Sequence, residues 1–181
     1  MRPLLLALFL AAATPAAALA TPTDDVVNAF TKMGTASSYH MAIQSAQGSM
    51  DIDMVPPDKM HMMGAHVEMI RIGGATYVKV NGNWMKLPAA MPQMQQQMGA
   101  VSYVQSVGNN AKQAKVEDLG SRSLDGATYH AYKVTGQDAK PATLYVDGSG
   151  YPARVDVVEE KGTSTVRFSK YNAPMTIAAP I

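Results

Sequence analysis

The sequence predicts an α+β fold dominated by one large antiparallel sheet. From residue 37 onward, most of the chain consists of short segments in which apolar and polar residues alternate, separated by turns rich in Gly, Pro, Asn and Asp. Two other segments, residues 24–34 and 88–112, repeat apolar residues with helical spacing instead. We therefore expect ten strands and two helical regions.

Residues 1–20 have the layout of a cleaved secretory signal. A single arginine precedes an apolar run from Leu4 to Ala13, and a small-x-small sequence ends at Ala20. The apolar run is too short for a stable membrane span. We expect a signal peptide over 1–20, a single domain over 21–181, and a periplasmic location.

The composition excludes several kinds of partner. Removing Arg2 from the 15 Lys and Arg residues leaves 14, against 14 acidic residues, so no basic field attracts nucleic acid. The chain has no cysteine, which excludes disulfides, thiolate chemistry and a lipidated cysteine anchor. We expect a protein without a membrane anchor and without a cofactor.

The first helix is expected over residues 24–34. Its apolar residues share one helical face, Thr23 or Asp24 is available as the N-cap, and Gly34 stops the helix. The apolar face consists of Val26, Val27, Phe30 and Met33.

Five strands are expected before residue 82. A hairpin turns at Gln47-Gly48, Pro56-Pro57 then interrupts the pattern, and Asn81-Gly82 is a strong turn signal ahead of Trp84. Short connections favour an antiparallel meander. The expected strands cover residues 39–44, 50–54, 59–63, 67–72 and 76–81.

Residues 88–112 interrupt the strand pattern with a helical stripe. Met91, Met94 and Met98 lie on one face of it, and Gly99 divides it into two short helices that are placed to cover a sheet face. The strand pattern then returns with clean alternation. The five further strands are expected over residues 116–124, 127–135, 143–146, 151–159 and 163–171.

Methionine is concentrated in the segment 49–69 and again in the helical stripe. Unbranched thioether side chains fill irregular gaps and accommodate varied partners, so two facing methionine-rich elements indicate an apolar cavity. The expected lining comes from Met41, Met54, Met60, Met62 and Met69 of the sheet and from Met91, Met94 and Met98 of the stripe.

The sequence offers three alternatives to an apolar cavity. A copper site could use Met60, His61, Met62 and His66, because thioether and imidazole suit Cu(I), although regular alternation turns His61 and Met63 away from Met60 and Met62. Asp51 and Asp53 fit the solvated side of a hairpin better than an acid/base pair, and Glu68 and Arg71 are expected on opposite faces. No catalytic motif occurs, so no enzyme is expected. The third alternative is an interaction or sensor module that holds no ligand.

The order of these parts resembles the periplasmic lipid-carrier superfamily, which includes LolA-like lipoprotein carriers and LppX/LprG-like lipid-binding proteins. The segments MVPPDKMHM, GNWMKLP and GATYHAYKV contribute to the likeness, and its most specific parts are YVDGSGYPARV and FSKYNAPMTIAAP. The resemblance extends over nearly all of the chain after residue 20.

The resemblance implies an unclosed, strongly curved antiparallel half-barrel with helices covering its concave face. It also implies an apolar cavity that holds a lipid, a lipoprotein acyl chain or another amphiphile, and a donor or acceptor membrane protein as partner. LppX/LprG-like proteins usually have a lipidated cysteine, which this chain lacks.

Overall fold

The computed structural model describes residues 20–88, 111–136, 140–160 and 162–181. The expected signal peptide lies outside these ranges, apart from Ala20. The helical stripe of Met91, Met94 and Met98 also lies outside the described residues.

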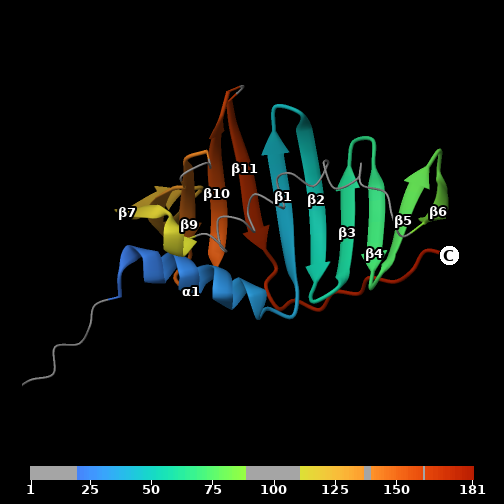
Figure 1. The fold of residues 1–181 in the computed structure, drawn as a ribbon, viewed down its shortest axis with the longest axis horizontal. Helices are drawn as coiled ribbons and strands as arrows, with labels where there is room; N and C mark the ends of the chain where they lie inside the picture. The colour runs from blue at the N-terminus through green and yellow to red at the C-terminus, as the bar shows by residue number, and fades with distance from the viewer. Residues whose placement is uncertain (1–19, 89–110, 137–139, 161) are drawn as a thin grey trace, which may run out of the picture.

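Eleven antiparallel strands form one sheet in the described residues (Figure 1). The order β6-β5-β4-β3-β2-β1-β11-β10-β9-β8-β7 consists of two meanders joined where β1 pairs with β11. β6 and β7 are the two edges and do not pair with each other, so the sheet is an unclosed half-barrel, as predicted. The strands are β1 Tyr39–Ser45, β2 Gly48–Val55, β3 Lys59–Gly64, β4 Glu68–Ile72, β5 Ala75–Val80, β6 Asn83–Leu87, β7 Lys115–Leu124, β8 Ala127–Thr135, β9 Ala142–Val146, β10 Pro152–Glu159 and β11 Gly162–Ser169.

Strand β6 is the element that the sequence pattern did not predict. The turn at Asn81-Gly82 was expected, and both residues have positive φ (51° and 83°), as a two-residue hairpin turn requires. The five residues after this turn pair with β5. They are too few for alternation to identify a strand alone, and pairing with β5 stabilises the extended conformation.

Helix α1 extends over Pro22–Gly34 and begins two residues earlier than predicted. Its N-cap is Thr21, not Thr23 or Asp24. The Thr21 hydroxyl accepts a hydrogen bond from the Asp24 backbone N–H (3.2 Å), and the Asp24 carboxylate accepts one from the Thr21 N–H (3.1 Å). Pro22 fits the first helical position because the N–H that it lacks would have no partner there.

One face of α1 packs on the sheet near β7 and β10 (Figure 1). Its buried residues are Val26, Ala29, Phe30 and Met33. These residues and the buried side chains of one sheet face form a single hydrophobic cluster. We call this face of the sheet the inner face and the opposite face the outer face. Within the described residues, the prediction of helices that cover the sheet face is confirmed for α1. The one further helical segment in these residues is the short 3₁₀ turn η2, Ala111–Gln113.

The C-terminal segment after β11 is attached to the start of β1. The Ser37 N–H donates to the Asn172 side-chain oxygen (2.9 Å), and the Ser38 hydroxyl donates to the Ala173 carbonyl (2.5 Å). Further on, Ile177 is buried against Ile70 and Tyr77 in a small second cluster. This segment therefore covers outer-face residues of β4 and β5, along the lower edge in Figure 1.

Three tyrosines are expected to make the stability of the fold sensitive to alkaline pH. Burial raises the pKa of Tyr39, Tyr132 and Tyr171 above the ordinary value of 10.0, and a hydrogen bond to Asp25 adds to the effect at Tyr132. These groups stay protonated in the folded state while the unfolded chain loses the protons near pH 10. Their contribution is complete below pH 10 and is lost as the pH rises further.

We therefore expect the free energy of unfolding, measured with urea, to be flat from pH 8 to 9. It should then fall by about 2–4 kcal/mol per pH unit above pH 10, because each of the three protons contributes about 1.4 kcal/mol per pH unit. Tyr132→Phe should reduce this slope. A constant free energy of unfolding between pH 9 and 11 would contradict the prediction.

Candidate functional site

Five methionines from four neighbouring strands lie together on the inner face. Cross-strand register places Met41 opposite Ile52, Ile52 opposite Met62, and Met62 opposite Met69. Met54 is opposite Met60 in the adjacent row. We call this set the thioether patch: Met41, Met54, Met60, Met62 and Met69.

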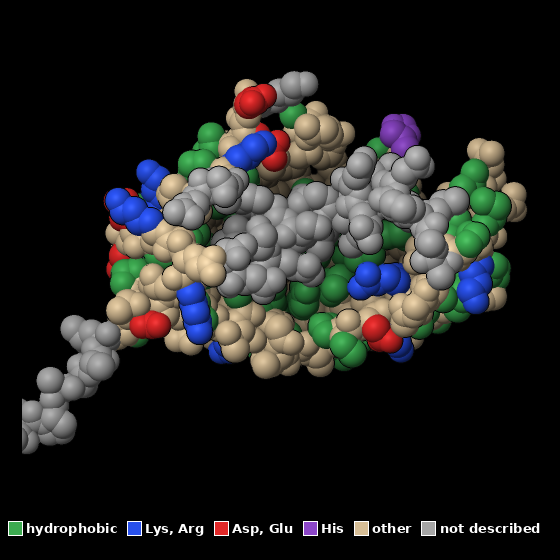
Figure 2. All heavy atoms as spheres, in the orientation of Figure 1, with side chains coloured by type: hydrophobic (Ala, Val, Ile, Leu, Met, Phe, Trp, Pro, Cys, Tyr) green, Lys and Arg blue, Asp and Glu red, His purple; other side chains and the backbone are tan. Residues whose placement is uncertain are grey.

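The structure thus brings together all five sheet residues that the sequence predicted as cavity lining. Their exposed fractions are only 1–8%, whereas Met63, which points to the outer face between the same strands, is 38% exposed. Strand alternation produces this separation. Figure 2 shows hydrophobic side chains on the viewed face, with Lys and Arg side chains both among them and at its margins.

An open hollow of about 590 Å³ lies at the ends of β5 and β6. Gly74, Ala75, Lys86, Leu87 and Pro88 line it. These residues do not include the thioether patch, and the hollow is too open to enclose an apolar molecule. We therefore place the candidate site at the patch, where the chemistry suits a hydrocarbon.

The four residues considered for copper do not share a face. His61 points to the outer face and contacts the Glu68 carboxylate (3.2 Å), while Met60 and Met62 point to the inner face. His66 lies in the exposed turn between β3 and β4. Within the described ranges, no three His, Asp or Glu side chains are grouped to hold a metal ion.

The outer face of β1–β5 has a series of ion pairs. His40 lies between Asp53 (2.7 Å) and Asp51 (3.2 Å), so the two aspartates are on the polar side of the hairpin, as predicted, but with an unpredicted partner. Lys79 binds Glu68 (2.9 Å) and, by this hydrogen bond, lowers the pKa of that carboxyl group. Trp84 also lies on this face, beside Lys79, and not in the thioether patch.

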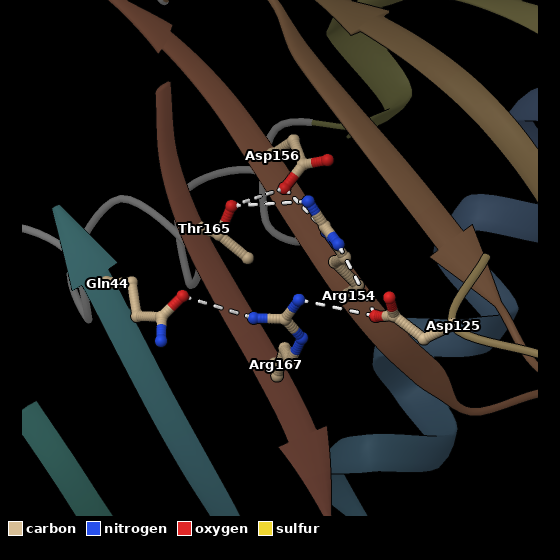
Figure 3. Close-up of polar contacts among 6 residues, drawn as sticks. All are labelled: Gln44, Asp125, Arg154, Asp156, Thr165 and Arg167. Carbon is tan, nitrogen blue, oxygen red and sulfur yellow. Dashed lines mark hydrogen bonds and ion pairs between the residues drawn. The ribbon is translucent and has the colours of Figure 1, made fainter. Parts of the chain in front are cut away.

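A second polar network joins β10 and β11 on the same outer face (Figure 3). Arg154 donates to Asp156 (2.7 Å), which also accepts from the Thr165 hydroxyl (2.7 Å). Arg167 binds Asp125 (3.3 Å) from the turn between β7 and β8, and it donates to Gln44 of β1 (3.2 Å). Both arginines therefore have hydrogen-bond partners within the sheet.

Arg71 is the residue of this region that sequence reasoning did not place in the site. It lies on the inner face, opposite Met60 and Thr76, whereas Glu68 faces outward, so the expected separation of Glu68 and Arg71 is confirmed. Its Nε is buried and has no hydrogen-bond partner among the described residues. Side chains alternate between the two faces along a strand, so Arg71, two residues after Met69, shares its face. This spacing was the sequence signal that could have placed Arg71 in the site.

The fold is that of two solved mycobacterial proteins. Over 87% of this chain and 98% of the other, the structure matches lipoprotein LppX of Mycobacterium tuberculosis with a TM-score of 0.62 and 18% identity. LprF of Mycobacterium bovis matches with a TM-score of 0.59 and 15% identity over 88% and 96% of the two chains. The resemblance to LppX-like proteins is therefore confirmed for the fold.

The same fold also occurs in a protein solved with a protein partner. MucB, in a complex with MucA, matches with a TM-score of 0.52 and 14% identity over 87% of this chain and 57% of MucB. No protein-family model matches the sequence, and no curated protein matches it. In the part of the chain that the structure describes, no helix has the length and apolar character to cross a membrane.

Proposed function

We propose that this protein is a periplasmic carrier that holds a lipid, a lipoprotein acyl chain or another amphiphile against the thioether patch. Residues 1–20 direct export, and residues 21–181 form one domain with neither a lipid anchor nor enzymatic activity. Met91, Met94 and Met98 complete the apolar lining. A membrane protein loads or unloads the ligand.

The observation that carries the proposal is the position of the thioether patch. Five buried methionines from four adjacent strands form one apolar surface, and the ion pairs of these strands lie on the other face. Burying hydrocarbon there contributes about 0.8 kcal/mol per CH₂ group. Methionine adapts its shape to chains of different length and branching. The fold shared with LppX and LprF also supports this function.

Native mass spectrometry of the protein purified from its own periplasm without detergent tests the proposal. We expect additional mass that extracts into organic solvent and fragments as an acyl lipid. A clean apo mass, with no uptake after incubation with periplasmic lipid extract, would contradict the carrier function. The same sample, titrated with Cu(I) against a chelator, tests the copper alternative.

A pair of neighbouring residues gives a sharper test of the site. Met62→Gln places an amide of similar size in the patch, whereas Met63→Gln makes the same change on the outer face. We expect Met62→Gln to weaken binding of a fluorescent fatty acid by about tenfold or more. Burying an amide under the ligand without a hydrogen-bond partner costs free energy.

Met63→Gln is the matched control and should change the affinity by less than twofold, since Met63 is 38% exposed. Far-UV circular dichroism and a thermal melt check that both variants are folded. Equal affinities of Met62→Gln and Met63→Gln, with both variants folded, would remove the patch from the binding site.

A further inference from the structure

Arg71 is the one charged side chain at the inner positions of the described strands β1–β6. Arg71 occupies a cross-strand row with Met60 and Thr76, and the next row contains Met62 and Met69. Every other inner position of these six described strands is uncharged. A cation in such a surface is costly unless a partner compensates its charge.

The partner is missing from the described residues. The buried Arg71 Nε donates no hydrogen bond, and no carboxylate in the described ranges forms an ion pair with the guanidinium. Glu68, three residues earlier, is directed to the outer face and is occupied by Lys79 and His61. A buried donor without a partner calls for an explanation, and an absent anion is one that fits.

The sequence around Arg71 reinforces this deficit of negative charge. No Asp or Glu occurs between Met69 and Val116, so the long connection from β6 to β7 contains no carboxylate that could neutralise Arg71. The compensating anion must come from another part of the chain or from a ligand. Among the described residues, no other part of the chain provides it.

We propose that Arg71 binds the acidic headgroup, a carboxylate or a phosphate, of the amphiphile whose hydrocarbon lies along the thioether patch. This inference rests on the proposed function and adds the headgroup class. A guanidinium donates two parallel hydrogen bonds to either group, which satisfies Nε and neutralises the charge. From β4 to β1 the patch extends for about 14 Å, so the hydrocarbon leads away from Arg71 across the strands.

The test compares three ligands with the same hydrocarbon: palmitic acid, hexadecyl phosphate and hexadecanol. Each displaces the neutral probe N-phenyl-1-naphthylamine from the full-length mature protein. We expect Arg71→Met to weaken binding of the acid or the phosphate by about tenfold or more and to change hexadecanol by less than twofold. Whichever acidic ligand loses more identifies the headgroup. Inorganic phosphate and acetate, which have no long hydrocarbon chain, should not displace the probe.

Two further variants control the comparison. Arg71→Lys keeps the charge and should retain part of the preference for acidic ligands. Arg122→Met removes the same charge from an exposed position of β7, where the guanidinium donates to the Ser121 carbonyl (3.1 Å), and should leave all affinities unchanged.

Several results would overturn the inference. One is an unchanged affinity of Arg71→Met for both acidic ligands. Another is an equal loss of affinity for hexadecanol and for the acidic ligands in both Arg71 variants, which would make Arg71 a structural residue. Binding of hexadecanol alone by the natural protein would overturn the headgroup assignment and leave the carrier function intact. Binding of none of the three would overturn both proposals.

Discussion

Replacing Phe30 by alanine is expected to lower the free energy of unfolding by about 3–5 kcal/mol. Phe30 is 8% exposed on the face of α1 that packs on the sheet, within the same hydrophobic cluster as the inner face. Removing its ring deletes apolar contacts and leaves a cavity that a helix resting on a rigid sheet fills incompletely. This loss is a large part of a typical total stability of about 5–15 kcal/mol.

Urea denaturation followed by circular dichroism measures the effect. The matched control is Thr31→Ala, the next residue of the same helix, which is exposed and should change the free energy by less than about 0.5 kcal/mol. Similar free energies for the two variants would show that α1 contributes little to the stability of the sheet.

The second large effect is expected at Tyr171, which connects three parts of the chain. Its ring stacks on Tyr151 with centroids 4.2 Å apart and approaches Tyr39 at 6.0 Å. Its hydroxyl donates to the Pro152 carbonyl (2.7 Å) at the start of β10. Tyr171→Ala removes the stacking and this hydrogen bond together, and we expect a loss of about 3–4 kcal/mol in the free energy of unfolding.

A graded variant separates the two contributions at this position. Tyr171→Phe keeps the ring and removes only the hydroxyl, so we expect a loss of about 1–2 kcal/mol, the usual effect of a buried carbonyl without its donor. It should also reduce the decline in stability above pH 10, because it removes one of the tyrosines with a raised pKa. Equal losses for Tyr171→Ala and Tyr171→Phe would contradict a role for stacking.

Much of the sheet was predictable because its information is local. Alternation along β1, β2 and β3 identified which methionines share a face. The turn at Asn81-Gly82 located one hairpin, and the turn predicted at Gln47-Gly48 lies one residue earlier, at Ala46-Gln47, with Gly48 already paired to Ser45. Glycine and asparagine adopt the backbone angles of such turns at little cost. The same alternation correctly predicted that His61 and Met60 point to opposite faces of β3.

The errors occurred where local signals compete or are short. Thr21, Thr23 and Asp24 are all good N-cap residues, and the reciprocal hydrogen bonds of Thr21 and Asp24 decided among them. Strand β6 has five residues, and pairing with β5 defines it. Neither choice depends on residue type alone.

The fold class, the strand faces and the composition of the thioether patch followed from the order of residues, because alternation with a period of two depends only on backbone geometry. Only the three-dimensional fold revealed the pairing of β1 with β11, the partners of His40, and the isolation of Arg71. Strands β1 and β11 are far apart in the chain and meet only when the two meanders join. The contacts of His40 and Arg71 depend on side-chain conformations, which alternation along a strand does not specify.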